Sequence, residues 1–179
     1  MSERKGEVKL PGTKLSTKEM YSLLGLVESA PQAKYEFSAG PSLSKFLQGL
    51  KEGKILGKRC PRCGRIYVPP RDYCEYCHVP LTNWVEVPDT GAVHTAVVSY
   101  ISTKRERLEK PEVVGVIRLD VPGYKEDSYE FAGLFHRLCI DPEEAKKDSA
   151  VGMKVKARWK PKEQRTGSIL DIECFEPVR

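Results

Sequence analysis

The spacing of apolar residues along the chain changes from a helical period to a strand period at about residue 80. Before that point, two segments repeat apolar residues every three or four positions. The first segment, 16–31, reads "STKEMYSLLGLVESAP" and has Ser16 and Glu19 in the spacing of a capping box, which favours the start of a helix. Pro31 ends this segment. The apolar residues on one face of the predicted helix are Met20, Leu23, Leu24 and Val27.

The second helical segment, 42–54, reads "SLSKFLQGLKEGK" and ends near Gly53, a residue type that commonly terminates helices. Its apolar face consists of Leu43, Phe46, Leu47 and Leu50. We expect both predicted helices to pack on their own domain through these faces. Docking onto a partner chain is the alternative, because a protein of 179 residues has few surfaces to cover.

Beyond residue 80, six segments are rich in β-branched and aromatic residues, and turn-forming sequences such as "PDTG" at 88–91 separate them, which predicts strands. One helical segment, 141–148, interrupts them, with Asp141 as the predicted N-cap and Pro142 in the first turn. If 81–87 only leads into the sheet, five strands remain with a helix between the third and fourth, the order expected of a five-stranded OB-fold barrel. The predicted strand segments are 81–87, 92–101, 112–120, 128–136, 153–160 and 168–177.

The stretch "RCPRCGRIYVPPRDYCEYC" at 59–77 contains two Cys-x-x-Cys pairs, formed by Cys60, Cys63, Cys74 and Cys77. Four thiolates are a complete tetrahedral ligand set for Zn²⁺ and leave no position for water, so we predict a structural zinc ribbon. Iron in the same site is an alternative. Disulfides within the pairs, or a redox motif, fit less well without an export signal or an α/β pattern. We interpret His78 as a neighbour of the site, not a ligand.

These patterns predict a mainly β protein with N-terminal helices, in which a rubredoxin-like zinc ribbon precedes a five-stranded OB-fold barrel. The predicted parts are an N-terminal extension with one amphipathic helix at 1–40, a helix leading into the ribbon at 41–58, the zinc ribbon at 59–83 and the OB-fold at 84–179. The sequence has no apolar run of the ~20 residues that a membrane span needs, and its N-terminus lacks the apolar centre of a secretory signal. We therefore expect a cytoplasmic protein.

Positive charge is concentrated around the cysteine segment, although the net charge of the chain is only +5. Between residues 44 and 71, eight Lys and Arg residues and one Glu give a net charge of +7, which leaves −2 for the remainder. Such a segment can attract phosphate groups, and a solvated charged face is the alternative. The basic residues are Lys45, Lys51, Lys54, Lys58, Arg59, Arg62, Arg65 and Arg71.

No motif in the sequence predicts catalysis by this chain alone. We find no Ser/His/Asp arrangement, paired carboxylates or phosphate loop. His94 and His136 lie in predicted strands and are interpreted as structural residues. Cys139 and Cys174 are interpreted as separate, buried, small apolar residues. A catalyst built on these two thiols and His136 is the weakest of the alternatives.

The segment 50–77, "LKEGKILGKRCPRCGRIYVPPRDYCEYC", followed by Trp84, by "DTGAVHTAVVSY" and later by "FAGLF" and "VGMKVKARW", closely resembles the acyl-CoA-associated family in which a zinc ribbon precedes an OB-fold. The match covers roughly residues 42–177. Its most specific pieces are the Gly-Lys steps before the first cysteine pair, "PPR" at 69–71, and Gly91. About forty residues at the front precede the point where compact members of this family begin.

The resemblance implies a non-catalytic, zinc-binding small subunit of a thiolase or HMG-CoA synthase type complex, including benzoylsuccinyl-CoA thiolase-like assemblies. Such a subunit would scaffold a thiolase-fold partner that performs the Claisen or retro-Claisen chemistry. It would also help to bind CoA or acyl-CoA, with aromatic-compound catabolism as the favoured context. The residues expected to contact the CoA phosphates are Arg59, Arg62, Arg65, Arg71, Lys54 and Lys58.

A module that binds single-stranded nucleic acid is the alternative from another class, because OB-folds and zinc ribbons both serve that purpose. The small overall charge argues against it. The aromatic residues of the predicted strands, which would have to stack on bases, have a spacing that suits core packing equally well. These aromatic residues are Tyr100, Tyr129, Phe131 and Phe135.

Overall fold

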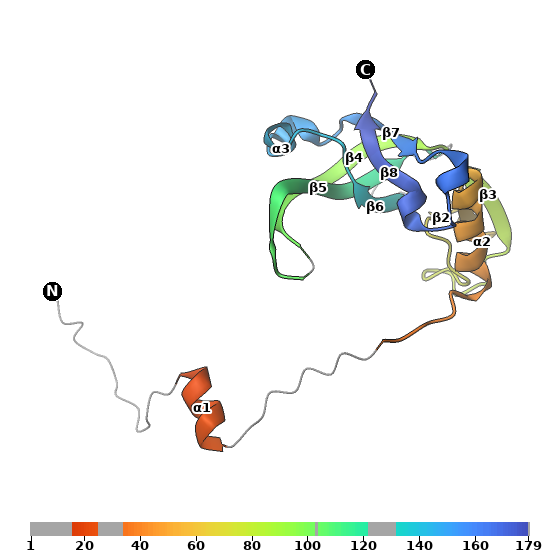
Figure 1. Cartoon of the computed structure of the whole chain (residues 1–179). Coiled ribbons are helices and arrows are strands. Elements are labelled where there is room, and N and C mark those ends of the chain that lie inside the picture. Colours follow the sequence, from red (N-terminus) through yellow and green to blue (C-terminus); the bar gives the residue numbers. More distant parts are fainter. Residues whose placement is uncertain (1–15, 25–33, 103, 122–131, 179) are drawn as a thin grey trace, which may run out of the picture. The chain divides into compact units, whose positions relative to one another are not determined.

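The structure, a computed structural model, describes residues 16–24, 34–102, 104–121 and 132–178. The chain divides into two compact units, Met1–Phe37 and Ser38–Arg179. Figure 1 labels the helices and strands of both units. The metal-ligating candidates and the predicted strands all belong to the second unit.

In the first unit, helix α1 spans Thr17–Leu24. Its predicted capping box is confirmed, because the Ser16 N–H donates to the Glu19 carboxylate at 2.8 Å and the Glu19 N–H donates to Ser16 Oγ at 3.2 Å. The expected packing of its apolar face is not observed, since its described apolar side chains are exposed. Val27 and Pro31 lie outside the described residues.

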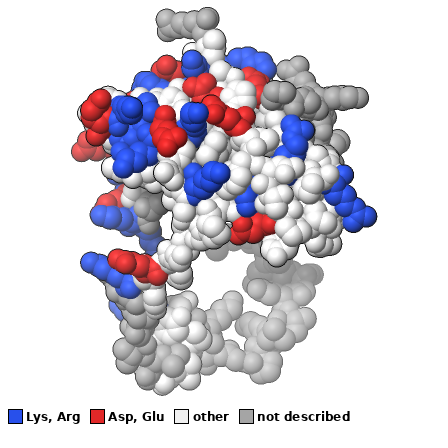
Figure 2. All heavy atoms as spheres, turned by 90° about the vertical axis from the view of Figure 1, so that its right-hand side faces the viewer, with Lys and Arg blue, Asp and Glu red and all other residues white. Residues whose placement is uncertain are grey.

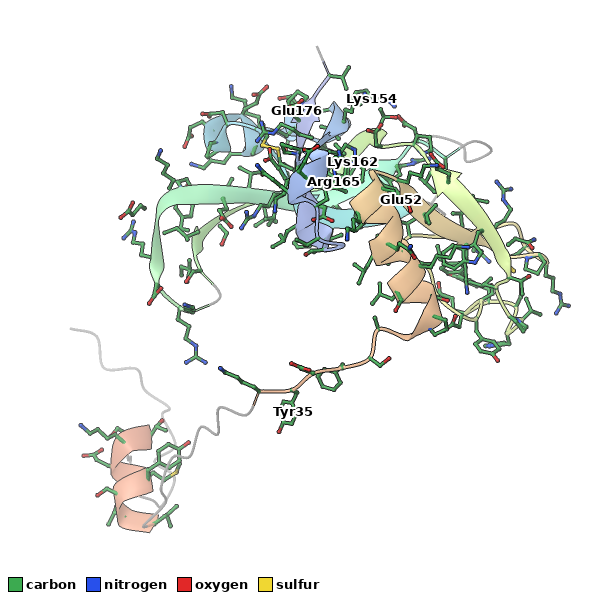
Figure 3. The ribbon with its side chains drawn as sticks, turned by 45° about the vertical axis from the view of Figure 1, so that its right-hand side comes forward. Tyr35, Glu52, Lys154, Lys162, Arg165 and Glu176 are labelled. Atoms are coloured by element: carbon green, nitrogen blue, oxygen red, sulfur yellow. A yellow bond between two sulfur atoms is a disulfide. The ribbon has the colours of Figure 1, made fainter. Side chains whose placement is uncertain are left out.

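Helix α2, Gly40–Glu52, confirms the second predicted helix and buries Phe46 and Leu50. Gly53 ends this helix with a φ of 81°, in the left-handed region that side chains with a Cβ rarely adopt. The guanidinium of Arg165 lies beside Gly53, so a Cβ at this position would require the Arg165 side chain to shift. Figure 3 labels Arg165 and Glu52, the last residue of α2. A cation at this end of the helix also complements the negative end of the helix dipole.

The cysteine segment folds into a three-stranded antiparallel sheet with the order β2-β1-β3. These strands are β1 (Ile55–Arg59), β2 (Ile66–Tyr67) and β3 (Asn83–Val87). Strand β3 pairs with β1 over its whole length, from Ile55↔Val87 to Arg59↔Asn83. The predicted segment 81–87 therefore belongs to the ribbon sheet, and it leads into the barrel without being one of its strands.

The remaining strands form a five-stranded antiparallel sheet with the order β6-β5-β4-β7-β8. The short helix α3 (Pro142–Ala145) lies between the third and fourth strands in the chain, and its predicted N-cap is confirmed because the Asp141 carboxylate accepts the Glu143 N–H at 2.8 Å. Three single-turn 3₁₀ helices connect the rest: η1 (Asp148–Ala150), η2 (Lys162–Gln164) and η3 (Ile169–Asp171). The strands are β4 (Thr90–Ile101), β5 (Arg107–Leu119), β6 (Gly133–Arg137), β7 (Lys154–Trp159) and β8 (Ile172–Pro177).

The two outer strands of this sheet, β6 and β8, meet and close it into a barrel, which confirms the predicted OB-fold architecture. Leu138, directly after β6, forms a parallel bridge with Phe175 of β8, and the Cys139 N–H donates to the Phe175 carbonyl at 2.8 Å. We call this junction the β6–β8 seam. The edges of the sheet are thereby covered within the chain itself.

A disulfide between Cys139 and Cys174 crosses the β6–β8 seam, drawn as the yellow bond in Figure 3. The interpretation of these cysteines as two separate apolar residues is therefore wrong. Cys174 is buried as expected, but Cys139 is exposed. The two residues are 35 positions apart in the sequence, and only the closure of the barrel brings their Cα atoms to 5.7 Å.

One hydrophobic core runs from α2 through the ribbon sheet into the barrel. Phe46 of α2, Ile55 of β1 and Val87 of β3 belong to the same buried cluster as Ile117 of β5 and Phe175 of β8. A second, much smaller cluster surrounds the cysteine pairs and consists of Cys60, Tyr67, Cys74 and Leu81. The ribbon and the barrel therefore share their main core, whereas the metal end of the ribbon has little apolar packing of its own.

His136 of β6 is buried in the barrel and joins the β6–β8 seam, since its Nε2 lies 3.0 Å from the Ile169 carbonyl. Its Nδ1 is buried without a hydrogen-bond partner among the described residues. Burial lowers the pKa of His136, because the charged imidazolium would have to exist away from water. Burial thus favours the neutral form of this imidazole, and its structural role stays a prediction.

We expect the stability of the protein to fall as the pH decreases below about 6.5, the pKa of His in an unfolded chain. Below pH 6.5, His136 binds a proton in the unfolded chain more readily than in the folded protein, because its folded pKa is lower, so acid favours unfolding. Above about pH 6.5, His136 is neutral in both states and contributes no pH dependence to the stability. Urea unfolding at a series of pH values measures the effect. His136→Leu should remove this part of the pH dependence, and His94→Gln, at an exposed position, should keep it. Equal pH profiles for His136→Leu and the natural protein would contradict the prediction.

Candidate metal centre and basic surface

The two Cys-x-x-Cys pairs converge at one end of the ribbon. The Sγ atoms of Cys60, Cys63, Cys74 and Cys77 all lie within 4.8 Å of one another, and those of Cys63 and Cys74 are 3.7 Å apart. Four Zn–S bonds of ~2.3 Å in a tetrahedron place the sulfur atoms roughly 3.8 Å apart. The donor set and its spacing therefore fit a zinc ion with four thiolate ligands and no water.

Tight turns hold the first cysteine pair in this arrangement. The N–H groups of Arg62 and Cys63 point at Cys60 Sγ at 3.4 and 3.5 Å, and Gly64, with a φ of 78°, returns its N–H to the Cys60 carbonyl at 3.0 Å. Backbone donors aimed at sulfur stabilise the thiolate form that binds metal.

The second pair is stabilised by a tyrosine as well as by the backbone. Burial of Cys74 opposes ionisation, but the Tyr67 hydroxyl at 3.2 Å and the N–H groups of Cys77 and Tyr76 lower the pKa of this thiol to about 6. His78 is exposed and contributes its backbone N–H to the Cys74 carbonyl at 2.9 Å. It is not part of the four-thiol group.

A polar network, buried at Lys58 and Ser42 and exposed at Asp72, anchors the second cysteine turn to α2 and β1. The Lys58 ammonium donates to Ser42 Oγ at 2.6 Å and to the Asp72 carboxylate at 3.1 Å, and Ser42 also hydrogen-bonds to Asp72. The same ammonium lies 5.0 Å from the centre of the Trp84 ring. Asp72 has its pKa lowered by the hydrogen bonds from Ser42 and Lys58. Sequence reasoning missed Ser42 and Asp72, since their contacts join residues 14 to 30 positions apart.

The basic residues of the ribbon segment differ in whether they are exposed and whether they pair with an acidic side chain. Lys58 is 93% buried in the network above, so it is a poor candidate for a phosphate contact. Lys54 pairs with Glu86 at 3.1 Å, and Arg71 pairs with Glu75 at 2.7 Å. The Arg65 guanidinium stacks on the Tyr76 ring at 3.6 Å.

Arg59 and Arg62 are exposed, and within the described part of the chain they form no ion pair. They flank Cys60 on either side, so the metal site fixes the backbone from which both guanidiniums extend. On the face seen in Figure 2, Lys and Arg side chains (blue) lie among Asp and Glu side chains (red). The +7 charge of the segment is thus partly neutralised by acidic residues from elsewhere in the chain, such as Glu75 and Glu86.

The aromatic residues weighed for base stacking do not all pack in the core. Phe135 of β6 is 65% exposed and Tyr100 of β4 is 43% exposed, so core packing does not account for them. Tyr129 and Phe131 lie outside the described residues. Two further exposed aromatic residues, Tyr73 and Tyr76, lie on the second cysteine turn.

None of the helices in the described part of the chain is long and apolar enough to cross a membrane.

A four-thiol ribbon joined to a five-stranded barrel defines a zinc-ribbon OB-fold protein. Residues 47–82 match the rubredoxin-like zinc ribbon domain of ChsH2, and residues 84–160 match the C-terminal OB-fold domain of ChsH2. The chain therefore belongs to the ChsH2 family, also called DUF35. The resemblance seen in the sequence is confirmed at the level of this two-domain family.

Three known proteins are similar to this chain. A DUF35 domain-containing scaffold protein of Methanocaldococcus jannaschii is 28% identical over 67 residues, which are 37% of this chain and 48% of the relative. The chain thus spans about half the length of this curated relative. A crystal structure of a DUF35 protein of unknown function from Sulfolobus solfataricus has a TM-score of 0.53 and 27% identity, over 78% of this chain and 87% of that one.

The third relative is a chain in the structure of the Ltp2-ChsH2(DUF35) aldolase. It has a TM-score of 0.54 and covers 79% of this chain and 98% of its own length. At 22% identity, this likeness concerns the fold alone.

Proposed function

We propose that this protein is a non-catalytic scaffold subunit that assembles with an enzyme acting on CoA thioesters through thiolase-type Claisen or retro-Claisen chemistry. The observation that carries the proposal is the ribbon and barrel match over residues 47–160 to a family in which one relative is described as a scaffold protein. The fold neighbour in an aldolase together with Ltp2 supports the same role. The reacting groups would belong to the partner.

In this proposal, Cys60, Cys63, Cys74 and Cys77 hold a structural Zn²⁺. Their spacing fits the ion, and a site with four thiolates supplies rigidity and no activated water. The metal would fix the two cysteine turns, and the network of Lys58, Ser42 and Asp72 would fix these turns to α2.

Arg59 and Arg62 are the residues that we propose to contact the CoA phosphates. Both are exposed and extend from the metal-fixed turn, whereas the charges of Lys54, Lys58 and Arg71 already have acidic partners. A guanidinium matches the geometry of a phosphate and forms charge-assisted hydrogen bonds to it. Arg65 would help by stacking, with Tyr76, beside the same turn.

Affinity capture of the chain from its own cells, followed by mass spectrometry and by co-expression with the captured enzyme, tests the scaffold role. We expect a thiolase-fold chain that co-elutes in a fixed ratio, and acyl-CoA turnover only when both chains are present. Turnover of a thioester by the isolated chain, or elution of the chain alone from mild extracts, would overturn the proposal.

In the reconstituted complex, the double substitution Arg59→Ala and Arg62→Ala should raise KM for the acyl-CoA about tenfold and leave kcat nearly unchanged, as expected when ~1.4 kcal/mol of ground-state and transition-state binding is lost together. Steady-state kinetics with CoA and 3′-dephospho-CoA thioesters measures this. If the arginines contact the 3′-phosphate, the double variant should distinguish the two substrates less than the natural protein does.

Lys147→Ala with Lys156→Ala is the matched control, because both lysines are exposed and lie outside the ribbon. An equal rise of KM in this control would show a general charge effect, and an unchanged KM in the arginine variant would remove these residues from the CoA site.

The exposed Tyr73, and the exposed Tyr76 with Arg65 stacked on its ring, keep nucleic-acid binding as the second candidate function. Bases stack on exposed aromatic rings and on guanidinium groups. Titration of a labelled single-stranded oligonucleotide with the isolated chain at several salt concentrations measures the affinity and tests this candidate. Tight binding with a steep salt dependence would favour this candidate over the CoA subunit.

A further inference from the structure

The β6–β8 seam contains a pocket whose wall includes both sulfur-bearing residues of the disulfide. The pocket has a volume of about 530 Å³, and Leu138, Ile140 and Ile172 contribute its apolar wall beside Cys139 and Cys174. Its charged lining is Arg137, Arg158, Lys160, Glu112 and Glu173. The disulfide therefore faces a cavity large enough for a small molecule, a feature that neither the ribbon nor the proposed scaffold function uses.

The two sulfur-bearing residues differ in their surroundings. Cys139 is exposed, whereas Cys174 is only 2% exposed. In thiol–disulfide exchange the attacking thiolate must reach one sulfur in line with the bond, so access decides which sulfur is attacked. Because Cys139 is the more exposed residue of the pair, the expected order is attack on its sulfur with Cys174 as the leaving thiolate.

The charged side chains of the pocket are largely paired. Arg137 pairs with Glu112 at 3.3 Å, and Arg158 pairs with Glu173 at 2.9 Å and with Glu176 at 3.5 Å. Lys160 interacts electrostatically with the buried Asp171 carboxylate. The volume and the apolar wall of the pocket, more than its charge, therefore limit which small thiols fit.

We propose that the Cys139–Cys174 disulfide is a thiol-exchange site for small thiols that fit the pocket beside it. The thiolate of the small thiol attacks Cys139 Sγ, forms a mixed disulfide with it and expels Cys174 as a thiolate. A second molecule of the thiol attacks the sulfur of the first one, which releases the oxidised small disulfide and leaves Cys139 as a thiolate. Protons from the two thiols end on the two cysteines, so the chain gains two electrons and two protons. The proposal is independent of the scaffold function.

Reduction at this site would loosen the β6–β8 seam. The contacts across it that would remain include the parallel bridge of Leu138 with Phe175, the hydrogen bond from the Cys139 N–H, and the edge-on contact of the His136 and Phe175 rings. Beside the seam, His136 Nε2 also contacts the Ile169 carbonyl. Ile169 begins η3, and η3 packs against α2. A change in the oxidation state of the disulfide would thus alter the packing of η3 against α2, the helix that precedes the ribbon.

The first test is equilibration of the full-length, zinc-loaded protein in buffers with different ratios of reduced to oxidised glutathione. Rapid alkylation and peptide mass spectrometry then measure the fraction of Cys139 and Cys174 that is oxidised, separately from the ribbon cysteines. We expect a reversible transition within the range of these buffers, with zinc retained. A pair that stays oxidised in all buffers until the protein is unfolded, or stays reduced in all of them, overturns the proposal.

The second test separates the roles of the two cysteines. Cys174→Ser should leave Cys139 able to form a stable mixed disulfide with glutathione, whereas Cys139→Ser should leave Cys174 unreactive in the folded protein. Cys174→Ala replaces the first variant if serine in the buried position prevents folding, and a cooperative thermal transition checks each variant. Glutathione found on Cys174, or on neither cysteine, contradicts the proposed order of attack.

Discussion

Replacing Cys74 with serine should release the metal and unfold the ribbon, the largest effect that we expect from a single substitution. Structural zinc contributes roughly 10–16 kcal/mol of apparent binding free energy in small zinc domains, and that energy is folding energy. The metal end of the ribbon has only the cluster of Cys60, Tyr67, Cys74 and Leu81 to replace it. We therefore expect the pairing of β1 with β2 to be lost, while the pairing of β1 with β3 and the barrel, which share the main core, stay folded together with the disulfide.

Metal content per chain and hydrogen exchange of the backbone amides measure the two halves of this prediction. The amides of 59–82 should exchange rapidly in the variant and in the natural protein treated with a chelator. Cys139→Ser with Cys174→Ser is the matched control, because it replaces two cysteines that lie outside the four-thiol group and should retain one zinc per chain. Full zinc content in the Cys74 variant, or protected ribbon amides without metal, would show that packing alone holds the ribbon.

Asp171→Ala should destabilise the protein by about 3 to 5 kcal/mol, the second largest effect, since it leaves several buried backbone donors without acceptors. The Asp171 side chain is fully buried and accepts the N–H groups of Thr166, Gly167 and Ser168 at 3.0, 2.7 and 3.1 Å. Its loop packs against α2, so its loss should also loosen the junction of ribbon and barrel.

Chemical denaturation at neutral pH measures the loss of stability, and Glu173→Ala is the matched control. Glu173 is an exposed carboxylate two residues away that pairs with Arg158, and an exposed ion pair contributes less than about 1 kcal/mol. A loss in Asp171→Ala no larger than in this control would refute the role of the buried carboxylate.

The same residue predicts the acid behaviour of the protein. Burial opposes ionisation of Asp171, but the three N–H donors outweigh it and lower its pKa. The group therefore stabilises the fold fully above the pKa of an unfolded Asp, about 3.9, and this contribution is lost as the pH falls through the lower folded value.

The elements whose signals are local in the sequence could be predicted. Both cysteine pairs, α2 with Gly53 at its end, α3 with Asp141 as N-cap, and the strands of the barrel all follow from residues within a few positions of one another. Helix α1 was predicted for the same reason, although its apolar face is not buried. A local pattern determines that a helix forms, but what covers it depends on residues far away in the chain.

The features that could not be predicted depend on closure of the barrel or on competing local signals. Nothing near Cys139 indicates Cys174 as its partner, because the pairing requires β6 and β8 to meet. The segment "SILDI" alternates like a strand, yet Ser168 and Asp171 form a capping box and its first part becomes η3. Lys58 stands among basic residues and so suggested a phosphate contact, whereas the fold buries it against Asp72.

The core that runs from α2 through the ribbon sheet into the barrel determines how this protein can be divided. Ile55 and Val87 of the ribbon sheet fill the same interior as Ile117 and Phe175 of the barrel. The ribbon and the barrel therefore cannot be exchanged independently. A chimera that takes one of them from a relative must also take core residues whose side chains pack against the other part. A change in side-chain volume on one side of this boundary therefore has to be matched on the other, although each half matches a domain model of its own.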